Sequence, residues 1–88
     1  MEILNYIQSQ SPPVIATFSV TIPALKLTLH KLKVMRSKKG HLFISYPSWM
    51  QEDYGQKSYH PYIEFDLEKK KEFESKVFEL LQYHHQVR

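Results

Sequence analysis

Two segments near the N-terminus alternate apolar and polar residues with the period of a β-strand. Val14–Ile22 alternates β-branched residues with smaller or aromatic ones, and this pattern predicts a strand. Residues 2–8 have enough apolar character for a shorter strand, which must end before Pro12 and Pro13 because proline cannot donate a ladder hydrogen bond. Pro23 then marks a tight connection to the next segment.

Residues 25–36 are also strand-like, but their alternation changes phase. Apolar residues stand at odd positions up to Leu29 and at even positions from Leu32 onward. Because successive side chains of a strand point to opposite faces, this slip at His30–Lys31 predicts a β-bulge or a bend.

A lysine-rich turn, Ser37-Lys38-Lys39-Gly40, follows this segment. Residues 41–46 alternate again beyond the turn. The two segments and the turn predict a β-hairpin.

The remainder of the chain changes from loop to helix. Residues 49–57 are polar and contain Gly55, so we expect a mobile loop there. Residues 59–65 resume strand-like alternation. Asp66 is then a predicted N-cap for a helix over residues 67–85. Its apolar positions recur at helical spacing and form one packed face, at Phe73, Val77, Leu80, Leu81 and His84.

This order of elements predicts an α+β fold. We expect a small antiparallel β-sheet of four to five strands with one C-terminal α-helix packed on it, forming a single domain over residues 1–88. A chain of 88 residues without cysteine lacks both a large core and disulfide staples, so association into a homodimer is expected to add stability. No export signal or membrane-spanning segment is recognised, and the predicted location is the cytoplasm.

Charge is distributed unevenly along the chain. Residues 1–51 carry six cations and one acid, a net charge of +5, whereas residues 52–88 carry six cations and eight acids, a net charge of −2. Five of the cations belong to the predicted hairpin and are candidate contacts to nucleic-acid phosphates: Lys31, Lys33, Arg36, Lys38 and Lys39. The alternative is a solvated edge strand, on which lysines discourage aggregation.

Aromatic residues cluster after this hairpin. We expect Tyr46 and Phe65 to pack against the helix, and Trp49 and Tyr54 to stay exposed in the loop. Exposed rings near cations can stack on unpaired bases. They can equally anchor a protein partner or a second copy of the chain.

Other chemistries find little support in the sequence. No Cys-containing or His-Glu-x-x-His spacing indicates a metal site, no glycine-rich phosphate loop or nucleophile elbow indicates an enzyme, and no cofactor is implied. We expect His30, at the phase slip, to make a structural hydrogen bond.

Five short motifs occur in an order that resembles the SpoVG family over nearly the whole chain: Ile15-Ala16-Thr17, His30-x-x-x-Val34, Gly40-x-x-Phe43, Pro47-Ser48 and His60-Pro61. The resemblance implies a small α+β protein that forms a homodimer by pairing of sheets. It also implies a bacterial cytoplasmic regulator of septation and sporulation that binds DNA or RNA. Family members place a basic pair after Pro-Ser, where this chain has Trp49-Met50.

The leading hypothesis is a non-catalytic nucleic-acid-binding protein. Its basic hairpin would neutralise the backbone, and the loop around Trp49 would add contacts. The alternative is a protein-interaction module in cell-division or septation control that docks a partner through Trp49 and Tyr54.

Overall fold

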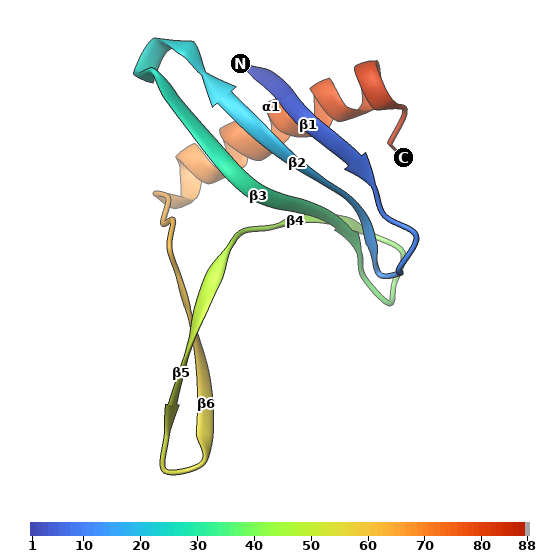
Figure 1. The fold of residues 1–88 in the computed structure, drawn as a ribbon. Coiled ribbons are helices and arrows are strands. Elements are labelled where there is room, and N and C mark those ends of the chain that lie inside the picture. The colour runs from blue at the N-terminus through green and yellow to red at the C-terminus, as the bar shows by residue number, and fades with distance from the viewer. Residues whose placement is uncertain (88) are drawn as a thin grey trace.

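The computed structural model describes residues 1–87 and contains six strands and one α-helix within them (Figure 1). In chain order the elements are β1 (Glu2–Gln8), β2 (Val14–Ile22), the 3-10 turn η1 (Pro23–Leu25), β3 (Leu27–Arg36), β4 (Leu42–Ser45), β5 (Ser48–Asp53), β6 (Gln56–Pro61) and α1 (Leu67–His85). Strands β1 to β4 form an antiparallel sheet in sequential order, and β5 pairs with β6 in a separate two-stranded sheet. The predicted α+β class is confirmed.

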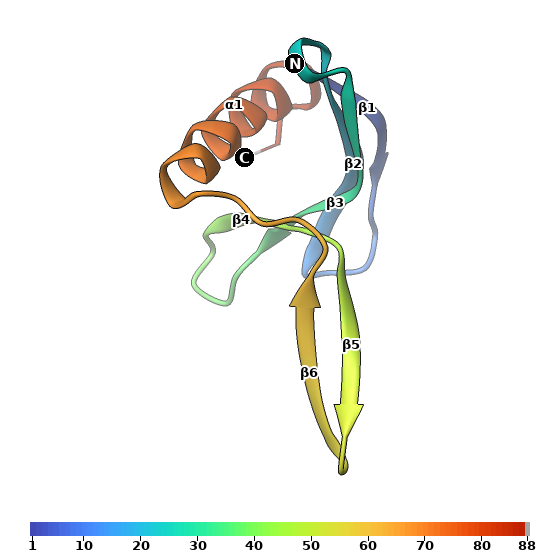
Figure 2. The same ribbon diagram turned by 90° about the vertical axis from the view of Figure 1, so that its left-hand side faces the viewer.

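The core lies between one face of the four-stranded sheet and α1, which covers that face alone (Figure 2). Along the central strands every second side chain is apolar and points toward α1, and on the helix apolar side chains recur every four residues. The apolar side chains of sheet and helix therefore pack together in one layer. The buried apolar residues are Ala16, Phe18, Val20, Leu32, Val34, Ile44, Phe73, Val77, Leu81 and Val87.

The predicted irregularity in β3 is a β-bulge. Phe18 of β2 pairs with Leu32, but Val20 pairs with Leu29, so Ser19 lies opposite two residues of β3. Lys31 is one of those two and has a φ of 62°, in the left-handed region. The extra residue returns both leucines to the core face, which explains the change of phase in the sequence.

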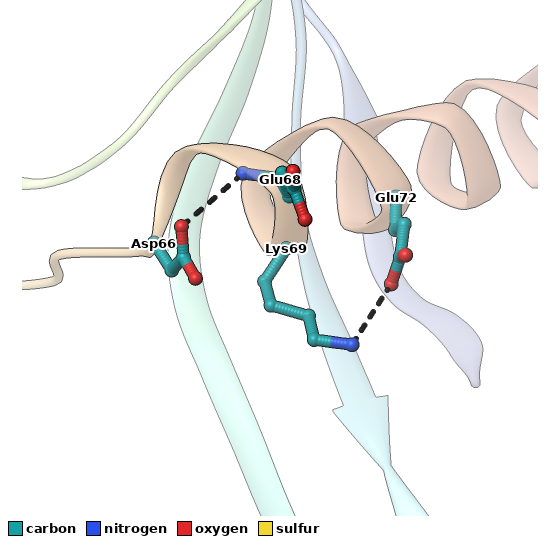
Figure 3. A network of polar contacts seen from close by, with 4 residues as sticks. All are labelled: Asp66, Glu68, Lys69 and Glu72. Atoms are coloured by element: carbon teal, nitrogen blue, oxygen red, sulfur yellow. Dashed lines mark hydrogen bonds and ion pairs between the residues drawn. The ribbon is translucent and has the colours of Figure 1, made fainter.

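Both ends of α1 are capped. The Asp66 carboxylate accepts a hydrogen bond from the backbone N–H of Glu68 at 3.4 Å, as predicted (Figure 3). The Lys69–Glu72 ion pair beside it, at 3.4 Å, is largely exposed and adds little stability. At the other end Gln86 adopts a left-handed conformation, and the N–H of Val87 donates to the carbonyl of Leu81, which places the Val87 side chain in the core.

The prediction of a mobile loop over residues 49–57 was wrong, because these residues form most of the β5–β6 hairpin. Asp53 pairs with Gln56 across a two-residue turn in which Tyr54 and Gly55 both have positive φ. Such turns match the twist of paired strands. The expected strand over residues 59–65 accordingly begins earlier and ends at Pro61.

Three smaller expectations also need correction. Strand β3 begins at Leu27, because residues 23–25 form the η1 turn. Strand β4 covers only Leu42–Ser45 of the expected residues 41–46. His84 is exposed, and its neighbour His85 packs instead, stacking on Tyr6 with 3.8 Å between ring centroids. His85 lies one turn beyond Leu81, so the apolar stripe continues at a spacing of four residues.

No helix among the described residues is long and apolar enough to cross a membrane.

Replacement of Leu81 by alanine tests the location of the core. Leu81 is fully buried, so Leu81→Ala is expected to lower the free energy of unfolding by about 2–5 kcal/mol. Urea denaturation followed by circular dichroism measures this loss. The exposed Ser75 on the same helix is the control, and Ser75→Ala should change stability by no more than about 0.5 kcal/mol. Equal effects of the two substitutions would contradict the described packing.

Candidate nucleic-acid interface

The face of the sheet that α1 leaves uncovered contributes to an open groove of about 850 Å³. The sheet forms its floor, and the segment that leads into the β5–β6 hairpin forms a wall. We call the hairpin, residues 48–61, the arm. Among the described residues that line the groove are two lysines and no acidic residue. The groove is therefore suited to an anionic ligand.

The floor of the groove depends on the bulge in β3. His30 and Lys31 both lie opposite Ser19, and both line the groove together with Lys33. In a regular strand, neighbouring residues point to opposite faces, so one of His30 and Lys31 would point toward the core. The Ser19 Oγ and His30 Nδ1 atoms are 3.0 Å apart, which fixes the imidazole on the floor and confirms the expected structural hydrogen bond.

The wall of the groove is formed where the chain leaves β4 and returns from β6. The backbone N–H of Tyr62 donates to the carbonyl of Pro47 at 3.3 Å, so the two chain segments stay paired at the base of the arm. Tyr62 lines the groove and remains 68% exposed. Its ring therefore offers an accessible flat surface beside the lysines on the floor.

Tyr46 anchors this wall to α1. Its hydroxyl donates to the Glu74 carboxylate at 2.7 Å, and its ring packs against Phe65 and Phe73, as predicted for Tyr46 and Phe65. The Lys70 Nζ lies 5.8 Å from the centre of the ring. Burial, with a further contribution from the hydrogen bond to Glu74 and its negative charge, raises the pKa of Tyr46 above its ordinary value.

The arm projects away from the sheet and helix, as both views show (Figures 1 and 2). Every residue of β5 is exposed, and of β6 only His60 is partly covered. His60 stacks on Trp49 with 4.5 Å between ring centroids, and Trp49 is 42% exposed. Tyr54, at the tip, is fully exposed.

The structure divides the predicted site residues into separate groups. Lys31 and Lys33 line the groove, and Trp49 and Tyr54 belong to the arm. Three cations lie at the β3–β4 turn and outside the lining of the groove: Arg36, Lys38 and Lys39.

Arg36 is engaged in its own turn, since its guanidinium donates to the carbonyl of Gly40 at 3.0 Å. Lys38 and Lys39 are exposed at the tip of that turn. Figures 1 and 2 both show this turn well away from the tip of the arm. The cations of this turn therefore lie apart from Tyr54 at the tip of the arm.

Sequence reasoning missed two contributors to the groove. The sequence does not distinguish Tyr62 from the other aromatic residues. No local pattern connects it with Lys31 and Lys33, which are about thirty positions away in the chain. His30 was assigned a structural role only, although it also lines the groove. In residues 1–87, no three histidine or carboxylate side chains lie close enough together to hold a metal ion.

No family model, curated protein or solved structure matches the chain.

Replacement of Tyr46 by phenylalanine tests the anchor. The hydrogen bond to the Glu74 carboxylate is partly buried, so Tyr46→Phe is expected to lower the free energy of unfolding by about 1.5–3 kcal/mol at neutral pH. A group that binds its proton more tightly when folded stabilises the fold below its unfolded pKa, about 10 for tyrosine, and this stabilisation is lost as pH rises further.

The difference between the two proteins should consequently shrink from about pH 9 to pH 11. Urea denaturation at each pH measures it. Because Tyr6, whose pKa is also raised by burial, is present in both proteins, its contribution cancels. A difference that is constant across this range would contradict the assigned role of the Tyr46 hydroxyl.

Proposed function

We propose that the protein is a cytoplasmic, non-catalytic nucleic-acid-binding protein and that single-stranded DNA or RNA is its ligand. The observation that carries this proposal is the composition of the groove, in which Lys31 and Lys33 lie beside the exposed ring of Tyr62 with no acidic residue in the described lining. The resemblance to the SpoVG family implies the same class of ligand. Fold alone does not decide the function, because α+β folds serve many purposes.

The lysines account for affinity without sequence specificity. Each ammonium group that neutralises a phosphate releases condensed counterions, so binding weakens as salt rises. Lysine is a flexible point charge that does not read base edges by bidentate geometry. The groove is therefore expected to bind many sequences with similar affinity.

The aromatic side chains account for a preference for single strands. Unpaired bases expose faces that stack on tyrosine or tryptophan, whereas the bases of a duplex are already stacked on one another. Tyr62 stands at the base of the arm, and Trp49 follows Ser48, another residue of the groove lining. A strand whose phosphates contact the floor can thus place bases against this wall.

Fluorescence anisotropy of labelled single-stranded DNA, RNA and duplex DNA, each at two salt concentrations, tests the proposal. We expect micromolar or tighter binding to single strands that weakens steeply with salt, and weaker binding to the duplex. Absence of binding to all three at low salt would refute the proposed function and would favour a protein partner as ligand.

Removal of the two groove lysines separates the groove from the β3–β4 turn. Lys31→Gln/Lys33→Gln is expected to reduce affinity for every single-stranded sequence and to lower the slope of log K against log salt by about 1.4, roughly 0.7 for each lost phosphate contact. Lys38→Gln/Lys39→Gln removes the same charge from the turn and is the matched control. A larger loss in the control variant would place the binding surface at the turn instead.

Substitution of Tyr62 tests stacking. Tyr62→Ala is expected to weaken binding to single strands by about 1–3 kcal/mol, the contribution of one stacked base. Tyr62→Phe keeps the ring and should bind nearly as well as the unaltered protein. The same anisotropy titration measures both variants, and equal losses for single-stranded and duplex DNA would argue against stacking.

A further inference from the structure

The arm is a two-stranded sheet without a layer packed against it. None of its residues belongs to the buried core, and a lone β-hairpin is only marginally stable in water. Its apolar side chains Trp49, Met50 and Tyr59 are between 42% and 70% exposed. Met50 and Tyr59 pair across the hairpin on one face, and Trp49 lies on the other, so a second surface against the Met50 and Tyr59 face would stabilise the arm.

The charges of the arm indicate what that surface is. Glu52 and Asp53 lie next to the turn, and one cation, Lys57, stands opposite Glu52 in the strand register. Asp53 accepts a hydrogen bond from the amide of Gln51 at 2.8 Å and has no cation opposite it in the register. The tip of the arm is therefore acidic, whereas the groove at its base carries Lys31 and Lys33.

The acidic tip and the cationic groove are separated by the length of the arm. Strand β5 has six residues, which span about 20 Å at roughly 3.3 Å per residue. When two copies lie with their arms antiparallel, the tip of each arm lies at the base of the other. Because the separation is the same in both copies, both contacts form at once under two-fold symmetry.

We propose that two copies of this chain exchange arms in this way, with Glu52 and Asp53 of each copy in the groove of the other. The arms then cover one another's Met50 and Tyr59 side chains, which pair across the hairpin and share one face of it. Charge complementarity favours a second copy, since this chain itself supplies both the acidic tip and the cationic groove at matching positions.

Arm exchange also regulates the groove, a consequence that rests on the proposed function. The acidic tip and a nucleic-acid phosphate would occupy the same lysines, so the two compete. In the exchanged dimer each groove is occupied by the partner's arm. Nucleic acid then binds only to protein whose groove is free of that arm.

Charge-reversed variants with complementary changes test the exchange directly. Sedimentation equilibrium at low salt is the measurement. The unaltered protein should be dimeric, and Glu52→Lys/Asp53→Lys and Lys31→Glu/Lys33→Glu should each dimerise at least tenfold more weakly. An equimolar mixture of the two variants should recover the dimer, because one contact then has the original charges and the other has both charges reversed.

Recovery in the mixture also shows that both variants are folded, since misfolded chains do not regain a specific contact on mixing. Lys38→Glu/Lys39→Glu, changed at the β3–β4 turn, is the matched control. It should dimerise normally by itself and should fail to restore the dimer of Glu52→Lys/Asp53→Lys. A monomeric unaltered protein, or a mixture that stays monomeric although circular dichroism shows both variants to be folded, would overturn the exchange.

Binding of a labelled single-stranded oligonucleotide distinguishes this proposal from the proposed function. Glu52→Lys/Asp53→Lys should bind it more tightly than the unaltered protein does, because no acidic tip competes for the groove. A monomer that binds the oligonucleotide would refute the exchange and leave the proposed function standing. A dimer that passes the mixing test but binds no oligonucleotide, even when Glu52 and Asp53 are replaced, would refute the proposed function and leave the exchange standing.

Discussion

Both faces of the sheet depend on the β-bulge at His30–Lys31. Without the extra residue, Leu29 and Leu32 would point to opposite faces, because a strand alternates its side chains. Holding Lys31 at a φ of 62° costs about 1–2 kcal/mol, and burying Leu32 completely contributes about 1.5–3 kcal/mol. Burial of Leu32 therefore offsets the strain at Lys31. The same irregularity leaves His30 and Lys31 together on the opposite face, so packing of the core and the charge of the groove have one cause.

The groove exists because a single α-helix of the described residues covers a single face of the sheet. Tyr46 is the connection between the covered and uncovered sides: its ring packs beside α1, its hydroxyl binds Glu74, and it also lines the groove. Directly beyond it the chain leaves the sheet and forms the arm. The arm adds nothing to the buried core, and strand pairing together with the Trp49–His60 stack holds it in place of core packing.

The sequence predicts correctly those parts of the fold in which the spacing of apolar residues reflects which side chains are buried. The phase change between Leu29 and Leu32 predicted the bulge, and helical spacing together with Asp66 predicted α1. The arm has no such pattern of apolar residues, because both of its faces are exposed and the alternation is interrupted by Gln51, Glu52 and Asp53. Its turn also begins with Tyr54 where asparagine or aspartate is usual. For the site, two of the five predicted cations were placed in the groove. Their approach to Tyr62 is a tertiary contact that no local pattern encodes.

We propose that single-stranded nucleic acid lies in the groove between the sheet and the base of the arm. Titration of isotopically labelled protein with a short single-stranded oligonucleotide, followed by amide chemical-shift changes, tests this most directly. We expect the largest shifts at five residues from separate segments that meet only in the folded groove: Thr17, Lys31, Lys33, Ser48 and Tyr62. Shifts confined to the Ser37–Gly40 turn, or no shifts at saturating oligonucleotide, would contradict it.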